Sequence, residues 1–215
     1  MKPLLYGIGV SPYVRKVRFV LACKGIEYDF DPVIPGQTPE DYSEFSPLKK
    51  VPAFRVGDFA ISDSSVICQY IEKKFNHQSI YPDSAEDLAR ALWFEEYADS
   101  RMTEILGGIF FNKIAKPLVF KMPADMERVA ELEARLPEVF DYLEKHLEGN
   151  KYLVGNSISL ADFSVISILQ NFIIAGYTID AEKWPGSAAY HQQIIQHPAI
   201  SMVLDKEVTE MAQMA

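Results

Sequence analysis

The sequence predicts two domains, a small α/β domain followed by a domain built only of helices. Short apolar or alternating segments typical of strands occur before residue 63, whereas the amphipathic patterns after residue 85 have helical spacing. The charge divides in the same place. Residues 1–80 carry 10 basic and 9 acidic side chains, and residues 81–215 carry 11 and 21. We therefore expect an α/β domain over residues 1–78, a linker at 79–85 and an all-helical domain over 86–215.

The first domain is predicted to begin with a strand, a helix and a second strand. Residues 3–8 are apolar, and Ser11 with Pro12 forms a helix-start signal, with serine as the N-cap and proline in the first helical position. Apolar residues then recur at helical spacing as far as Gly25, a residue type common at helix ends. Residues 27–33 alternate as in a half-buried strand. A strand–helix–strand order implies a parallel pair of strands.

A hairpin and a helix complete this domain. Gly57 and Asp58 separate two strand-like segments, residues 53–56 and 59–62, as in a β-hairpin. A helical pattern follows over residues 63–75. The hairpin adds antiparallel strands to the parallel pair, so we expect a mixed sheet.

The second domain is predicted to centre on one buried helix. A long amphipathic pattern over residues 124–147 contains Pro137, which predicts a kink or break. Further on, Ser159 can cap a helix with Asp162 as the acidic member of a capping box, so we interpret Asp162 as a folding residue. Residues 160–175 contain only that charge, and a helix that is apolar nearly all round is buried.

Composition excludes several classes of protein. No apolar run reaches the roughly 18 residues that a membrane-spanning helix needs, and the N-terminus lacks the pattern of a secretory signal. Cys23 and Cys68 have neither disulfide-framework nor zinc-ligand spacing, and a net charge of −9 disfavours a nucleic-acid partner. We expect a cytoplasmic protein that binds no metal, nucleic acid or membrane.

Four local features, in order along the chain, resemble the cytosolic glutathione S-transferase family. They are Ser11-Pro12-Tyr13 leading to Lys24-Gly25-Ile26-Glu27-Tyr28, which is similar to the opening of serine-type (tau-, zeta- and theta-like) members; Ser46-Pro47 leading to Val51-Pro52-Ala53-Phe54; Ile61-Ser62-Asp63-Ser64-Ser65; and the capped helix that begins at Ser159. The resemblance covers essentially the whole chain. It implies the glutathione transferase fold, with an α/β thioredoxin-like N-terminal domain and an all-α C-terminal domain.

The resemblance also implies where glutathione binds. Ser11 would donate a hydrogen bond to the glutathione sulfur and favour the thiolate, which is the nucleophile. Val51, before a cis Pro52, would present its backbone to the cysteinyl part. Asp63 and Ser64 would hold the γ-glutamyl end.

For other positions, the resemblance to the family is less specific. Lys50 is similar to a family position that helps to hold the glycine carboxylate, with Lys49 as an equal alternative, and Gln37 would assist from the preceding loop. The pocket for the second substrate is expected to include Val10, Tyr13, Leu106 and Phe110.

Several residues also have a structural explanation or a rival. Ser11 and Asp63 can each simply cap the helix that follows. Some branches of the family use a tyrosine at the end of the first strand, but that residue would fall at position 7, which is glycine here, so we interpret Tyr6 as a core residue. Cys23 and Cys68 lie within helical patterns, which disfavours a disulfide-exchange reaction.

We therefore predict a glutathione transferase that conjugates the glutathione thiolate to small, electrophilic, apolar substrates, as in detoxification. Glutathione is the cosubstrate, and a homodimer is expected from the resemblance alone. Three alternatives share the fold. One is a non-enzymatic carrier of apolar ligands, which would bind glutathione without turning it over. Another is a regulatory protein of the stringent-starvation type, against which Ser11 and Asp63-Ser64 weigh. The third is a glutathione-dependent isomerase, against which the lack of a Ser-rich, Cys-containing loop weighs.

Overall fold

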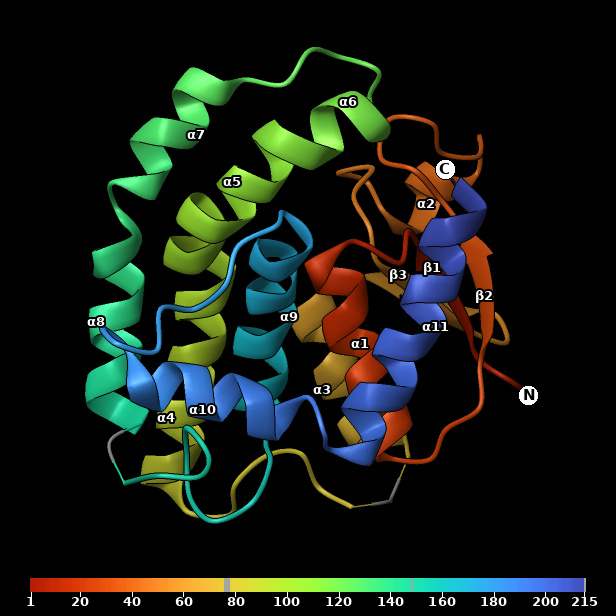
Figure 1. Ribbon diagram of the computed structural model, residues 1–215. Coiled ribbons are helices and arrows are strands. Elements are labelled where there is room, and N and C mark those ends of the chain that lie inside the picture. Colours follow the sequence, from red (N-terminus) through yellow and green to blue (C-terminus); the bar gives the residue numbers. More distant parts are fainter. Residues whose placement is uncertain (76–77, 148, 215) are drawn as a thin grey trace. The chain divides into compact units, whose positions relative to one another are not determined.

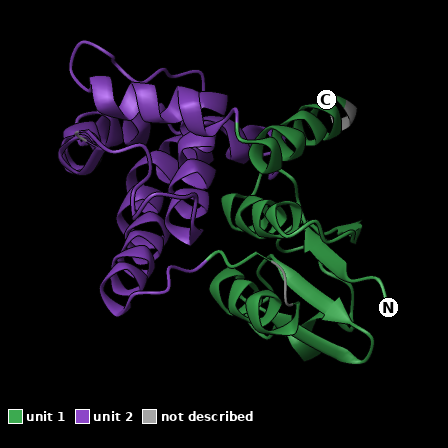
Figure 2. Ribbon diagram, turned by 90° about the horizontal axis from the view of Figure 1, so that it is seen from below, with its two compact units in different colours: residues 1–80, 197–215 green, residues 81–196 purple. Residues whose placement is uncertain are grey.

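The chain divides into two compact units, shown in Figure 2. This computed structural model describes residues 1–75, 78–147 and 149–214. Unit 1 comprises residues 1–80 together with 197–215, and unit 2 comprises residues 81–196. The last helix, which the sequence analysis assigned to the helical domain, thus belongs to unit 1.

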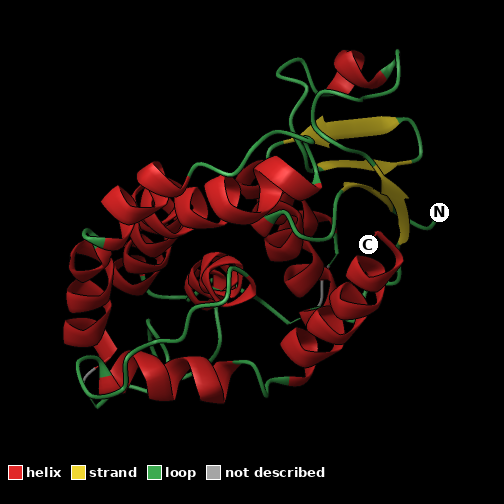
Figure 3. Cartoon of the chain, turned by 45° about the horizontal axis from the view of Figure 1, so that its top comes forward, coloured by secondary structure: helices red, strands yellow, loops and turns green. Residues whose placement is uncertain are grey.

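The strands of unit 1 form one mixed sheet, as predicted (Figures 1 and 3). Its order is β2-β1-β3-β4, in which β1 and β2 are parallel and the other neighbours are antiparallel. The four strands are β1 (Leu4–Gly7), β2 (Asp29–Pro32), β3 (Ala53–Val56) and β4 (Phe59–Ser62). The last two form the predicted hairpin around Gly57, whose φ of 62° suits a residue without a Cβ.

Two helices of unit 1 pack against its first helix. The helices described in this unit are α1 (Pro12–Cys23), α2 (Tyr42–Phe45), α3 (Ser64–Lys74) and α11 (Pro198–Met214). Both α3 and α11 contact α1, and Figure 1 shows α11 running beside it. Every residue of α1 from position 14 to 21 is buried as a result.

Two ion pairs explain why α11 lies on α1. The Arg15 guanidinium donates to both carboxylate oxygens of Glu207 at 2.8 Å, and both side chains are buried. One turn further on, Arg18 donates to both oxygens of Glu210 at 2.9 and 2.6 Å. A buried guanidinium needs an anionic partner, and α11 supplies one to each of these arginines.

Unit 2 is helical and is built around α9 (Leu160–Ile174), which contacts α4, α5, α10 and the segment η1. Nearly all of α9 is buried, as its apolar sequence predicts. The other helical segments are α4 (Ala85–Tyr97), η1 (Ala98–Gly107), α5 (Gly108–Phe110), η2 (Phe111–Ala115), α6 (Lys116–Leu118), α7 (Met126–Glu133), α8 (Leu136–Leu147) and α10 (Pro185–Ile194).

Two local predictions for unit 2 are confirmed. The long pattern over residues 124–147 breaks between α7 and α8, and Pro137 is the second residue of α8, where its missing N–H costs little. At the start of α9, the Asp162 carboxylate accepts the Ser159 backbone N–H at 2.9 Å, as in the predicted capping box. Over the described residues, none of the helices has both the length and the apolar character needed to cross a membrane.

Candidate active site

The register of the sheet brings the predicted site segments to one end of unit 1. Tyr6, near the end of β1, pairs with Ala53 at the start of β3, which pairs with Ser62 at the end of β4. The end of β2 lies there too, because Gly7 pairs with Pro32. Three segments therefore lie at the same end of the sheet: the loop of Ser11, the segment before β3 and the start of α3.

Ser11 lies in a tight turn between β1 and α1. Its N–H donates to the Ile8 carbonyl at 3.0 Å, and its own carbonyl accepts the Arg15 N–H of the first helical turn at 2.9 Å. Ser11 occupies the N-cap position, yet its hydroxyl makes no capping hydrogen bond to α1. The side chain is half-buried at the helix start, where the helix dipole favours a negative charge. The hydroxyl is thus not used to cap α1.

The peptide bond between Val51 and Pro52 is cis, as predicted. The backbone just before Val51 is held in place, because the carbonyl of Lys50 accepts hydrogen bonds at 2.9 Å from both the Tyr42 and the Ser46 hydroxyls. Those two side chains are buried. The sequence analysis named Ser46 only as part of a family motif, without this role, and did not name Tyr42. A hydroxyl four or eight residues before Lys50 has no recognisable pattern, so only the fold reveals this support.

Asp63 joins β4 to α3 in an unusual backbone conformation, with φ 79° and ψ 126°. Its Oδ1 accepts the N–H groups of Ser65 and Val66 at 3.0 and 3.1 Å, so Asp63 does cap α3. A side-chain-bearing residue in such a sparsely populated region costs about 1–3 kcal/mol, and such strain is concentrated at functional sites. Ser64, which begins α3, is buried.

The remaining glutathione-binding candidates lie at the same end with exposed side chains. Lys50 and Lys49 directly precede the cis peptide, and Lys49 has a φ of 52°. Gln37 closes a turn after β2, in which its N–H donates to the Ile34 carbonyl at 2.9 Å. The structure therefore keeps both lysines available near the cis peptide.

The candidates for the second-substrate pocket lie in different parts of the chain. Val10 precedes Ser11 in the β1–α1 turn and Tyr13 is the second residue of α1, and both are half-buried. Leu106 and Phe110 belong to unit 2, where both side chains are buried.

Tyr6 is a core residue, which confirms its interpretation. Its ring packs against Tyr42 and Phe45 with centroids 5.9 and 5.4 Å apart, and burial raises the pKa of its hydroxyl. At position 7 a side chain has no room, because a Cβ on Gly7 would lie 2.4 Å from a methyl group of Val14. A thiol-activating tyrosine is therefore excluded from this position.

The cysteines and possible metal ligands add no second reactive centre. Neither Cys23 nor Cys68 forms a disulfide, and burial raises the pKa of the Cys23 thiol, which makes it less reactive. In the part of the chain that the structure describes, no group of three or more His, Cys, Asp or Glu side chains is placed to hold a metal ion.

This arrangement suits a short, anionic, peptide-like ligand. The start of α1, whose N-cap side chain makes no capping hydrogen bond, favours negative charge. The extended segment at the cis peptide offers backbone hydrogen-bonding groups, as in strand addition.

Known proteins match both halves of the chain. A family model described as "Glutathione S-transferase, N-terminal domain" matches residues 5–79, and one described as "Glutathione S-transferase, C-terminal domain" matches residues 110–207. Glutathione S-transferase 3 of Zea mays is 31% identical over 170 residues, which cover 75% of each chain. A glutathione S-transferase of Triticum aestivum is 27% identical over 209 residues, 94% of this chain and 93% of its own.

The solved structures agree on the fold. The crystal structure of a glutathione S-transferase from Rhodospirillum rubrum F11 superposes with a TM-score of 0.85 at 22% identity, over 94% of this chain and 91% of that chain. The two domain models occur in the predicted order, and the identity to the Zea mays protein extends over three quarters of both chains. The chain belongs to the glutathione S-transferase family.

Proposed function

We propose that the protein is a serine-type glutathione transferase in which Ser11 activates the thiol of glutathione. The observation that carries this proposal is the Ser11 hydroxyl, which does not cap α1 although it stands at the start of that helix. The cis Pro52 and the Asp63-Ser64 segment lie at the same end of the sheet and would bind the rest of the peptide. Glutathione transferase activity is also what the family and the fold support.

The energetic requirement on Ser11 is modest. A thiol with a pKa of about 8.5 is only a few per cent ionised at neutral pH. Lowering that pKa by about two units requires roughly 2.7 kcal/mol of differential stabilisation. One hydrogen bond to a charged group contributes about 1.5–3 kcal/mol, and the helix start adds to it.

The reaction follows from the thiolate. In a substitution, the glutathione sulfur forms a bond to the electrophilic carbon, and the leaving group departs with the electron pair of its broken bond. The thiol proton passes to solvent when the thiolate forms. Glutathione is thus consumed as a cosubstrate.

The Ser11→Ala variant tests the catalytic assignment. The hydroxyl's loss is expected to raise the pKa of the bound thiol and to lower turnover at neutral pH roughly 30-fold, corresponding to about 2 kcal/mol of transition-state stabilisation. The pH–rate profile should shift to higher pH, with activity partly recovered as bulk base ionises the thiol. Ultraviolet absorbance of the bound thiolate across pH measures the pKa directly.

Ser84→Ala is the matched control, because the Ser84 hydroxyl does cap its helix by accepting the Asp87 N–H at 3.1 Å. That variant should lower thermal stability and leave the thiol pKa in place. If Ser11→Ala behaves in the same way, Ser11 is not the activating residue.

Asp63→Gly tests the binding of the γ-glutamyl end. Glycine tolerates a φ of 79°, so this variant keeps the backbone conformation and removes only the carboxylate. We expect the glutathione Kd to rise about 10- to 100-fold, since a hydrogen-bonded ion pair with the ligand's ammonium group is lost. Calorimetry at millimolar glutathione measures it.

The control for this variant is Asp125→Gly, which removes another helix-capping aspartate; Asp125 accepts the Arg128 N–H at 3.0 Å. It should not change the Kd. Equal affinity in the folded Asp63→Gly variant would restrict Asp63 to the role of a cap.

We also propose that the protein is a homodimer. On unit 1, Phe59 is 48% exposed and stacks on Tyr70 with centroids 4.7 Å apart, and Val66 on the same helix as Tyr70 is 47% exposed. Such neighbouring apolar groups favour association. Phe59→Glu is expected to produce a monomer in analytical ultracentrifugation, whereas Met202→Glu, which changes an equally exposed apolar residue on α11, should not. A wild-type monomer would disprove the proposal.

A cytoplasmic location completes the proposed function. Two cysteines that form no disulfide suit a reducing compartment. Recovery of the protein in a membrane or secreted fraction after cell fractionation would count against this location.

A further inference from the structure

The turn that carries Ser11 lies directly against α11. Its N–H···O bond from Ser11 to Ile8 encloses two residues, Gly9 and Val10. A Cβ built on Gly9 would lie 2.4 Å from Oε2 of Glu210, 3.4 Å from Nη1 of Arg18 and 3.6 Å from Cγ of Glu207. A side chain at position 9 would require the Glu210 carboxylate to shift, so the Arg18–Glu210 ion pair lies directly against the turn.

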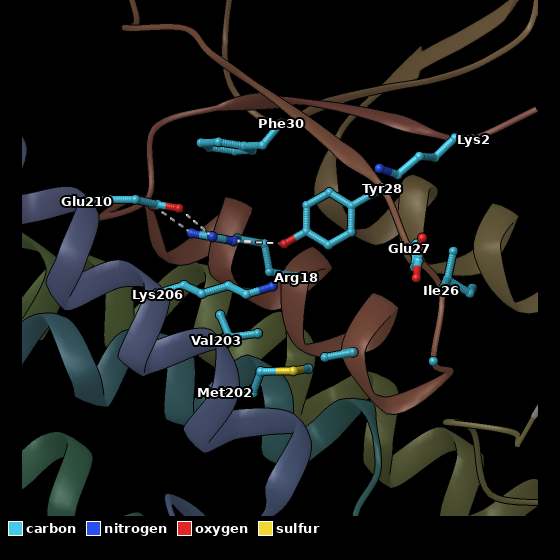
Figure 4. A pocket seen from close by; sticks show the side chains of 12 residues that line it. Lys2, Arg18, Ile26, Glu27, Tyr28, Phe30, Met202, Val203, Lys206 and Glu210 are labelled. Atoms are coloured by element: carbon cyan, nitrogen blue, oxygen red, sulfur yellow. Dashed lines mark hydrogen bonds and ion pairs between the residues drawn. The ribbon is translucent and has the colours of Figure 1, made fainter.

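Other side chains hold the Arg18–Glu210 ion pair in place. Besides its two bonds to Glu210, Arg18 donates from Nε to the Tyr28 hydroxyl at 3.0 Å, and its guanidinium lies 4.9 Å from the centre of the Phe30 ring (Figure 4). The Arg18 side chain is 2% exposed. A guanidinium fixed in this way gives the Glu210 carboxylate a defined position.

The position of Glu210 depends on its ion pair with Arg18, because a groove lies along one side of α11. A groove of about 580 Å³ separates Met202, Val203 and Lys206 of α11 from the segment 25–30, which leads into β2 (Figure 4). Near the groove, the Arg18–Glu210 pair joins α11 to α1, one turn beyond the buried Arg15–Glu207 pair. Weakening it would loosen the outer turn of α11 next to Gly9, while the Arg15–Glu207 pair still holds the helix on α1.

We infer that Glu210 is a positioning residue for thiol activation: with Arg18 it holds α11 against Gly9 and thereby fixes the turn that presents the Ser11 hydroxyl. The inference rests on the proposed function. A hydrogen bond to a thiolate requires the donor to be placed to within about 0.5 Å, and a 1 Å misplacement can lower a rate about 100-fold. Glu210 does not touch glutathione in this scheme; it acts through Gly9.

Glu210→Gln tests the inference with almost no change in shape. The charge-assisted pair with Arg18 is weakened, so we expect the pKa of the bound thiol to rise by about one unit and kcat at neutral pH to fall about tenfold, with less than a twofold change in glutathione Kd. Gly9→Ala, which places a Cβ against the same carboxylate, should have the same effects. Asp205→Ala, an exposed acidic residue on the same helix, is the matched control and should change none of these quantities.

A double-mutant cycle shows whether the effect passes through Ser11. In the Ser11→Ala background, Glu210→Gln should cause no further rise in the thiol pKa. A further rise in the thiol pKa equal to that in the single variant would overturn the inference. If the wild-type protein shows the thiolate band, an unchanged thiol pKa in Glu210→Gln would overturn it as well. A wild-type protein that binds no glutathione or shows no thiolate would instead refute the proposed function, and this inference with it.

Discussion

Replacing Asp162 by alanine is expected to lower the free energy of unfolding by about 3–5 kcal/mol, because each buried donor left without an acceptor costs about 1–3 kcal/mol. The Asp162 side chain is completely buried. It accepts the Leu153 N–H at 3.1 Å, the Ser159 N–H at 2.9 Å, the Ser159 hydroxyl at 3.3 Å and the Tyr190 hydroxyl at 3.0 Å. Alanine would leave these donors buried without an acceptor, in addition to removing the cap of α9.

Urea denaturation measures this loss. Burial raises the pKa of Asp162 to about 6, so the carboxylate is ionised at neutral pH, where the measurement should be made. The control is Asp87→Ala, which removes an aspartate paired with Arg90 at the surface and should cost less than about 1 kcal/mol. A loss of that size for Asp162→Ala would show that Asp162 contributes no more than an ordinary surface cap.

Replacing Glu207 by alanine is expected to have an effect of similar size, about 3–5 kcal/mol, because it leaves the Arg15 guanidinium buried without a counter-ion. Arg15 is fully buried, and Glu207 is 3% exposed in its side chain. The same measurement by urea denaturation applies. Hydrogen exchange should show faster exchange of amides in α11 and α1, since these helices are held together by this pair.

A double variant separates the cost of an unpaired charge from the worth of the pair. Replacing both partners, as in Arg15→Met with Glu207→Leu, removes both charges at similar volume and should recover most of the lost stability. If the double variant is as unstable as Glu207→Ala alone, the loss comes from packing of α11 rather than from the charge on Arg15.

The sequence was sufficient to predict the elements whose signals are local. Ser11 and Pro12 marked the start of α1, and the Gly57-Asp58 pair marked the hairpin of β3 and β4. Ser159 and Asp162 marked the start of α9, and the near absence of charge along that helix predicted its burial. Each of these signals lies within a few residues of the structure it determines, which is the range over which backbone hydrogen bonds and helical periodicity act.

The structure alone decided how distant segments support the predicted site. Tyr42 and Ser46 hold the Lys50 carbonyl beside the cis peptide, although nothing in their spacing predicts it. Gly9 was not singled out in the sequence, because its requirement for a small residue comes from Glu210 on α11.

The placement of α11 is the main feature that the sequence did not predict. An amphipathic helix satisfies its apolar face equally well on any apolar surface, so the pattern of residues 198–214 could not distinguish the helical unit from unit 1. The ion pairs that select α1 join residues 192 positions apart. The sequence by itself therefore determined the elements, the family resemblance and the candidate residues. The helix against which α11 packs was decided only in the tertiary structure, because the buried Arg15 and Arg18 of α1 need anionic partners that α11 supplies.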